Sequence, residues 1–237
     1  METIETLKEK LMPLYQKMLD ECKSEGDGLV PFCVQWGRKY PMASGKNILF
    51  VGKATNGWRK FYDLDTFFNG SSDKRGFTRQ DQMTHSVPTP YFNANKSAFW
   101  RVIRQVTQAF YPDTTDWCTP IAWTDLYKLA PEKKGKPTIS NQTRELQLAH
   151  CKHIFRTEIE ALQPDIVVLL TSNWEGHFLF NLNGGIHTTS IDEYDALNIR
   201  AYRIGNRLFV AAPHPQGKRE KEIANKIIEM IKKHSEE

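Results

Sequence analysis

The sequence has no long apolar run. No stretch approaches the roughly 18 uninterrupted apolar residues that a membrane span needs, so we expect no membrane partner. Residues 1–5 are acidic and lack the apolar core of a signal peptide. Both absences predict a cytoplasmic protein.

Cysteine is scarce and widely spaced. The four cysteines are Cys22, Cys33, Cys118 and Cys151, and no two of them have C-x-x-C spacing. This spacing argues against zinc sites and redox dithiols, so we expect four small thiols, buried or half-buried. The Walker P-loop and the dinucleotide fingerprint are missing as well. We therefore expect no cofactor and no metal.

The chain also lacks a strong excess of charge of one sign. It has 32 Lys+Arg against 28 Asp+Glu, a formal net charge of +4, which permits a nucleic-acid partner without arguing for one. A chain of 237 residues is long enough to bury a full core. Because neither an internal repeat nor a linker is visible, we expect one domain over residues 1–237.

What is present is an alternation of helical and strand patterns. Apolar spacing predicts helices over residues 4–18, 99–110, 174–180 and 223–231, and Ser140 is placed to cap a helix that runs to about residue 162. Short apolar runs predict strands at 47–51, 121–126, 165–170 and 207–211, and Gly205-Asn206 predicts a hairpin with 199–204. This order is typical of an α/β fold. We expect a three-layer α/β/α arrangement with a four-stranded, mostly parallel central sheet.

Residues 59–96 are polar, aromatic and rich in turn residues. Irregular stretches of this length are rarely simple connectors, so we expect a long functional loop. Its aromatic residues are Phe61, Tyr62, Phe67, Phe68, Phe77, Tyr91 and Phe92. We expect at least half of them to pack the loop onto the domain, and Tyr91 and Phe92 to stack on a base.

Two loops follow predicted strands at the end of the sheet where α/β proteins bind ligands. In the loop 52–58, Gly52 precedes the small residues Ala54 and Thr55. Its backbone can therefore approach a ligand closely and offer N–H groups to an anion. Such a turn is often purely structural.

The loop 211–219 carries the stronger signal. His214 lies between Pro213 and Pro215 and is followed by Gln216, Lys218 and Arg219. Because prolines fix the backbone, they fix where the imidazole points, which suits a preorganised site.

Four motifs in this order resemble the uracil-DNA glycosylase superfamily. They are Gly52-Lys53-Ala54 after the first strand, Thr124-Asp125-Leu126-Tyr127-Lys128 after the second, residues 162–169 around the third, and His214-Pro215 after the last. The match spans residues 47–218, and it is the ordered set that makes it specific.

The resemblance implies a protein of base excision repair that extrudes a damaged base from DNA and hydrolyses its glycosidic bond. Flipping is required because that bond is inaccessible inside a stacked duplex. In this family the first motif positions water, the Asn of the second motif reads the base edge, and the His of the last motif stabilises developing negative charge. His214 matches that histidine. The resemblance places Pro215 and Gln216 in the loop that pushes into the duplex, and Lys218 and Arg219 are expected to contact phosphates.

The chain departs from the family pattern at two positions. Lys53-Ala54 occupy the first-motif positions without the water-activating carboxylate or amide, so Asn56 is our candidate replacement, with Asp81 or His85 as alternatives. Asp125 stands in place of the base-reading Asn. An ionised Asp offers only acceptors, so it suits a base edge with an amino group, or it must be protonated.

Iron–sulfur members of the superfamily use four cysteines. Cys151 stands where one of them falls, but Leu129 replaces its partner, so we expect no cluster and interpret Cys151 as a core thiol. The basic residues 133–136 are interpreted as a solvated loop first and a phosphate contact second.

The leading hypothesis is a divergent DNA glycosylase that acts on a damaged or modified base. Two alternatives stay open, a non-catalytic nucleic-acid-binding protein of the same fold and a hydrolase or binder of free nucleosides or nucleotides. The sequence gives neither the target base nor the oligomeric state.

Overall fold

The computed structural model describes residues 4–22, 28–43, 45–55, 61–70, 77, 94–132 and 139–235. The chain divides into two units, each assembled from separate segments. The first unit comprises Met1–Val34, Lys53–Thr78 and Asp125–Gln163, and the second comprises Gln35–Gly52, Arg79–Thr124 and Pro164–Glu237. Six α-helices and a seven-stranded mixed sheet in the described residues make the fold α/β, as expected.

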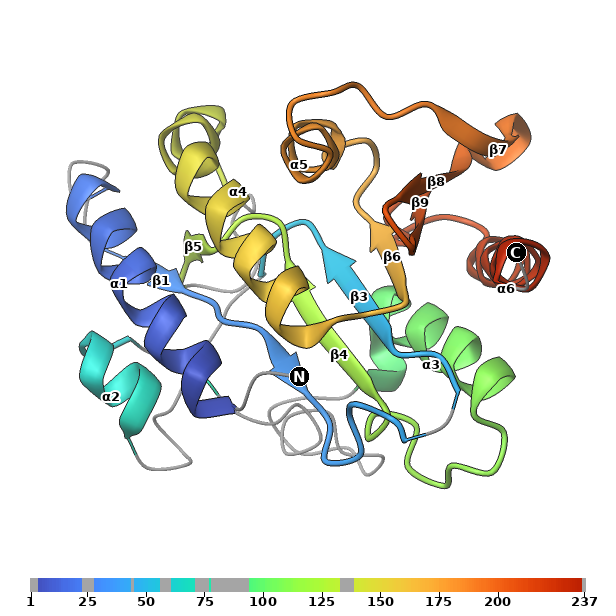
Figure 1. Cartoon of the computed structure of the whole chain (residues 1–237), viewed down its shortest axis with the longest axis horizontal. Helices are drawn as coiled ribbons and strands as arrows, with labels where there is room; N and C mark the ends of the chain where they lie inside the picture. Colours follow the sequence, from blue (N-terminus) through green and yellow to red (C-terminus); the bar gives the residue numbers. More distant parts are fainter. Residues whose placement is uncertain are drawn as a thin grey trace. The chain divides into compact units, whose positions relative to one another are not determined.

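Helices dominate the first unit. Helix α1 (Ile4–Cys22) packs beside α4 (Asn141–Leu162), as Figure 1 shows in blue and yellow. The predicted apolar face of α1 is buried, since Leu7, Leu11 and Met18 are at most 4% exposed. A small antiparallel ladder joins β1 (Leu29–Pro31) to β5 (Leu129–Pro131).

The cap predicted for α4 is confirmed. The Ser140 hydroxyl accepts a hydrogen bond from the Thr143 backbone N–H at 2.9 Å, which satisfies one of the open donors of the first turn. The helix ends at Gln163, whose φ of 47° is left-handed. Leu162 is its last helical residue, as the sequence predicted.

The expected loop 59–96 is not wholly irregular. Helix α2 (Leu64–Asn69) begins after Asp63, whose carboxylate accepts from the Thr66 N–H at 2.7 Å. Six residues show too little apolar spacing for a helical pattern, so only the capping Asp63 signalled this helix. Phe67 and Phe68 are buried beside Tyr15 of α1 and Phe77 is buried beside Phe68, so these aromatics pack the segment within the first unit as expected.

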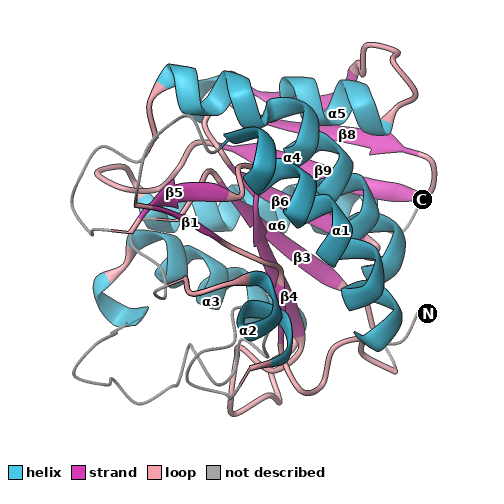
Figure 2. Cartoon of the chain, turned by 90° about the vertical axis from the view of Figure 1, so that its left-hand side faces the viewer, coloured by secondary structure: helices cyan, strands magenta, loops and turns pink. Residues whose placement is uncertain are grey.

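The large sheet has the strand order β2-β4-β3-β6-β9-β8-β7, and Figure 2 shows its strands in magenta. The four predicted strands are its neighbours β4 (Ile121–Asp125), β3 (Ile48–Gly52), β6 (Ile166–Leu170) and β9 (Arg207–Ala212). Asp125, the last residue of β4, already belongs to the first unit. Strand β6 runs parallel to both β3 and β9, and all three are almost wholly buried.

The sheet is therefore larger and more mixed than the four-stranded, mostly parallel sheet that we expected. Strand β8 (Ile199–Ile204) forms the predicted hairpin with β9, and β7 (Ser190–Tyr194) and β2 (Gln35–Trp36) add further antiparallel strands. β7 is polar and largely exposed and β2 has two residues. Neither shows the apolar run or alternation that signals a strand.

Three further helices complete the second unit: α3 (Ala98–Phe110), α5 (Gly176–Leu182) and α6 (Glu220–His234). α3 packs against α6, and α6 also packs on β9. Arg101 of α3 holds the Glu220 carboxylate with two bonds of 2.7 and 2.6 Å. The 3-10 turns are η3 (Ala94–Lys96) and η4 (Asp195–Leu197). None of the helices in the described ranges combines the length and the apolar character needed to cross a bilayer.

Candidate functional site

In the second unit, the carboxyl ends of β6 and β9 bring two loops together. The strands pair in parallel with Leu170 opposite Ala212, so residues 171–175 and 213–219 leave the same edge of the sheet. The backbone N–H groups of Thr171 and Ser172 both donate to the Ala212 carbonyl, at 3.1 and 3.3 Å. This pairing fixes the β6 loop beside the β9 loop.

His214 is held at this edge from three sides. Its backbone N–H donates to the Ser172 hydroxyl at 2.8 Å, and its ring lies nearly parallel to that of Phe99 on α3, with centroids 6.0 Å and planes 12° apart. The Gln216 backbone N–H donates to His214 Nδ1 at 3.3 Å. Because an amide N–H can only donate, Nδ1 is the acceptor and the neutral ring carries its proton on Nε2. The ring therefore has a hydrogen-bond donor at Nε2.

The β6 loop that holds His214 is strained. Ser172 and Asn173 have φ of 51° and 69°, and Asn198 beyond η4 has φ of 52°. Most side chains disfavour this left-handed region, at about 1–3 kcal/mol for a residue such as Ser172, whereas Asn adopts it readily. The Asn198 amide donates to Asn173 Oδ1 at 3.2 Å, which joins the two left-handed asparagines.

A cavity of about 560 Å³ opens at the same edge of the sheet. Its walls are Ser172, residues 195–198, Pro213, residues 217–219 and Ile223 of α6. It thus includes the expected phosphate-contacting residues Lys218 and Arg219. Arg219 pairs with Glu222 at 3.2 Å, whereas Lys218 forms no ion pair within the part of the chain that the structure describes.

The first unit holds a second set of expected site residues. The Tyr127 backbone N–H donates to the Lys53 carbonyl at 3.0 Å, which ties the loop after β3 to the segment that follows Asp125. Lys53 and Ala54 are half-buried, and Thr55 is 5% exposed. Within the described residues, the Thr55 hydroxyl and Asp125 Oδ2 are buried and have no hydrogen-bond partner. Two such groups on neighbouring segments mark a place where a ligand's polar edge would complete the hydrogen bonding.

Asp125 lies beside a fully buried ion pair. Lys128 Nζ contacts both carboxylate oxygens of Glu158, at 2.8 and 3.0 Å, and also donates to the Asp125 backbone carbonyl at 2.6 Å. The Lys128 charge is thus matched by Glu158. Loss of hydration raises the pKa of Asp125 to about 7, Lys128 lowers it and Glu158 raises it further. Near neutral pH, the carboxyl of Asp125 can donate as well as accept.

Sequence reasoning missed three of these features: the Lys128–Glu158 pair, Ser172 and the 195–198 wall. Glu158 had a signal, because it follows Cys151, Ile154 and Phe155 at helical spacing on the buried face of α4. A charged residue on such a face needs a partner. Ser172 and the 195–198 segment had none, because their role depends on strand pairing.

The expected site residues divide between the units. The first carries Lys53, Ala54, Thr55 and Asp125, and the second carries Gly52, His214, Pro215, Gln216, Lys218 and Arg219. Asn56, Tyr91 and Phe92, with Asp81, His85 and the basic residues 133–136, lie outside the described residues.

The four cysteines, all within the described residues, are buried thiols that form no disulfide, as the sequence predicted. Cys151 is a core thiol of α4 that donates to Gln147 Oε1 at 3.2 Å, and burial raises its pKa to about 12. Among the described residues, no three His, Cys, Asp or Glu side chains are grouped to hold a metal ion.

No protein-family model matches the chain, and a search of curated proteins gives no significant match.

Proposed function

We propose that the chain is a divergent DNA glycosylase that hydrolyses the N-glycosidic bond of a damaged or modified base. The proposal takes the chain as one domain with the three-layer α/β/α arrangement of the uracil-DNA glycosylase superfamily. The observation that carries it is His214, fixed at the carboxyl end of β9 with Nδ1 accepting from the Gln216 N–H, which leaves Nε2 as the donor of the neutral ring.

The chemistry needs a donor at the departing base. When the bond between the base nitrogen and sugar C1′ breaks, the electron pair goes to the base and negative charge gathers on its oxygen. A preorganised donor at that oxygen stabilises the transition state, and its removal typically costs about 10²–10³ in rate. Water then adds its hydroxyl to C1′, and its proton ends on the base. His214 Nε2–H supplies the donor.

Asp125 is assigned the role of reading the base. Burial has already removed water from the carboxyl, which favours its neutral form. A neutral carboxyl offers one donor and one acceptor, as Asn does, and matches a base edge with a carbonyl beside a ring N–H. The ionised form suits an exocyclic amino group instead. Thr55 adds a second hydroxyl donor and acceptor for the same base.

The first motif supplies no carboxylate, since Lys53-Ala54 occupy its positions. Asn56 is retained as the residue that orients the attacking water. Gly52 and the 53–55 backbone approach the ligand, Tyr91 and Phe92 stack on the extruded base, and Lys218 contacts a phosphate.

The test is a panel of oligonucleotides with single modified bases, followed by alkaline cleavage at abasic sites. We expect cleavage with at least one modified base, and a loss of about 10²–10³ in single-turnover rate for His214→Ala with unchanged oligonucleotide affinity. The matched control is His153→Ala, on α4 of the first unit. Lack of base release across the panel, or equal rates for His214→Ala and wild type, would contradict the proposal.

The missing first-motif acid favours a second candidate, a nucleic-acid-binding protein without catalysis. It predicts oligonucleotide affinity that falls steeply with salt while no base is released from any member of the panel.

A further inference from the structure

The cavity at the ends of β6 and β9 has a lining that the assigned roles of His214 and Asp125 do not use. Its residues all belong to the second unit. Its volume of about 560 Å³ lies within the range of small-ligand sites, roughly 300–1,000 Å³. It is therefore large enough for a nucleotide, the repeating unit of a DNA strand.

The lining combines apolar, neutral polar and charged surface, and its charged residues are Asp195, Lys218 and Arg219. Leu197, Pro213 and Ile223 are apolar and offer a sugar or base a face to pack against. Ser172 and Asn198 supply a hydroxyl and an amide for polar edges. Lys218 brings a cation to the rim, and its charge has no acidic partner within the described residues, whereas that of Arg219 is shared with Glu222. A phosphate is the group that such a cation prefers on a nucleotide.

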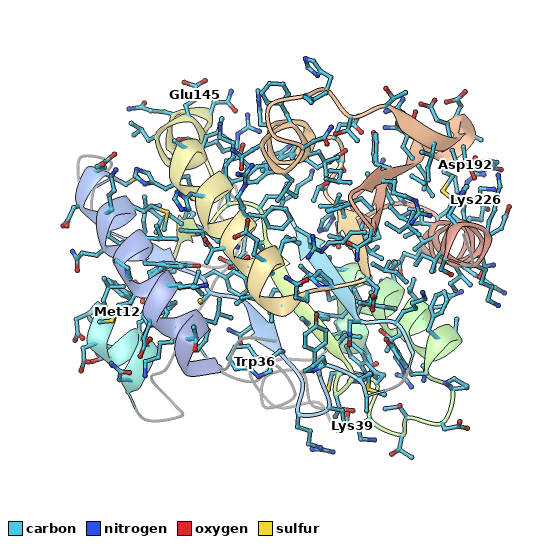
Figure 3. All side chains as sticks on the ribbon, in the orientation of Figure 1. Met12, Trp36, Lys39, Glu145, Asp192 and Lys226 are labelled. Carbon is cyan, nitrogen blue, oxygen red and sulfur yellow. The ribbon has the colours of Figure 1, made fainter. Side chains whose placement is uncertain are left out.

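The 195–198 wall of the cavity is built into the fold. Residues 195–198 follow β7, and α6 holds β7 through Asp192, whose carboxylate contacts Lys233 and His234, each at 2.9 Å. Lys226 of α6 also lies over the Tyr194 ring, 4.6 Å from its centroid. Figure 3 shows Asp192 and Lys226 where β7 meets α6. The 195–198 wall is thus held in place through β7 and α6.

One residue connects the cavity with His214. Ser172 lines the cavity, and its hydroxyl accepts the His214 backbone N–H at 2.8 Å. A ligand in the cavity can therefore contact Ser172, the residue whose hydroxyl positions His214.

We infer that this cavity binds one nucleotide unit, with its phosphate at Lys218 and its sugar and base against Leu197 and Ile223. This source of the ligand rests on the proposed function. The bound nucleotide then belongs to the DNA strand, and it is a different nucleotide from the one that carries the target base. A free nucleotide has the same chemistry, so the experiment includes both sources.

The experiment measures binding rather than catalysis. A fluorescein-labelled single-stranded decanucleotide without a modified base is titrated by anisotropy, and deoxythymidine 5′-monophosphate is titrated by protein NMR, with inorganic phosphate as the comparison. Ala196→Trp fills the cavity without removing a polar contact, and Lys218→Gln removes the cation. The controls are Ile186→Trp, at a position 67% exposed and outside the cavity, and Lys221→Gln on the exposed surface of α6. Urea unfolding verifies that each variant is folded.

We expect Ala196→Trp and Lys218→Gln to weaken decanucleotide binding about tenfold, with less than twofold change in the controls. Lys218→Gln should also lower the slope of log affinity against log salt by about one. If the monophosphate shows the same losses and the decanucleotide does not, the cavity serves free nucleotides and the inference stands without the strand. Equal affinities in all variants overturn it, as does inorganic phosphate binding as tightly as the monophosphate. Absence of base release leaves these readouts intact, so the proposed function can fail separately.

Discussion

Burial of Asp125 has consequences for stability as well as for base recognition. Its pKa of about 7 in the folded protein lies above the ordinary value near 4, chiefly because the carboxyl is dehydrated. Between these two values the folded state binds more protons than the unfolded state. Stability therefore falls as pH rises through this window, and it levels off above pH 7.

Asp125→Asn is expected to remove this pH dependence, because an amide keeps the shape of the carboxyl without titrating. At pH 4 the variant and wild type should be similarly stable, and at pH 8 the variant should be more stable by several kcal/mol, on the order of 4. Urea unfolding at pH 4, 6 and 8 measures the difference. The exposed substitution Asp113→Asn is the control and should leave the pH dependence of wild type unchanged. If the unfolding free energies of Asp125→Asn and wild type differ by the same amount at all three pH values, the ionisation argument is refuted.

The Lys128–Glu158 pair allows a sharper test of buried charge. Both side chains are 0% exposed, so Glu158→Leu leaves an uncompensated cation in the core and should cost about 3–5 kcal/mol of unfolding free energy. The double variant Lys128→Met/Glu158→Leu should recover most of this loss, since two apolar side chains replace the pair. Urea unfolding of wild type, Lys128→Met, Glu158→Leu and the double variant gives the coupling energy. If the double variant is less stable than Glu158→Leu, the uncompensated Lys128 charge is not what destabilises Glu158→Leu and this account is wrong.

At the scale of elements, local patterns predicted helices and central strands well. α4 starts where Ser140 indicated it and ends at Leu162, and the four central strands coincide with short apolar runs. Elements without such a signal were missed. α2 is one and a half turns long, and β7 is held by pairing with β8 and by α6 rather than by an apolar face of its own.

Helix caps give a prediction at this scale. The Ser140 cap of α4 accepts at 2.9 Å, whereas the Ser97 cap of α3 accepts from the Trp100 N–H at 3.5 Å. A longer hydrogen bond is weaker, so Ser140→Ala should cost about 1 kcal/mol and Ser97→Ala clearly less. Thermal and urea unfolding of both variants provide the comparison. Ser140→Asp, which keeps an oxygen acceptor at the cap, should remain close to wild type, and equal losses in the two alanine variants would count against the distance argument.

At the scale of the whole molecule, the sequence predicted an α/β fold but not the division of its site residues. His214 could be singled out because prolines flank it, and Asp125 because the family resemblance puts it where a base-reading Asn is expected. The hydroxyl that anchors His214 and the ion pair beside Asp125 join residues 42 and 30 positions apart. Such pairings depend on the order of strands and on which helix face is buried, and no local pattern encodes that order.

The two units are interleaved along the chain, and this leads to a prediction about how they unfold. The backbone passes from one unit to the other five times, for example between Thr124 and Asp125 inside β4. Unfolding one unit therefore releases the ends of several segments of the other, so we expect a single cooperative transition.

The cysteines report on both units. Cys22, Cys33 and Cys151 belong to the first unit and Cys118 to the second, and all four are buried. Burial also raises the pKa of the Cys33 and Cys151 thiols, which suppresses the thiolate that alkylating reagents attack. Brief iodoacetamide pulses along a urea titration, read for each cysteine by mass spectrometry, should give four labelling curves with one midpoint, equal to that of far-UV circular dichroism. A Cys118 curve displaced from those of Cys33 and Cys151 would mean that the units unfold separately, because each thiol is then exposed by the opening of its own unit alone.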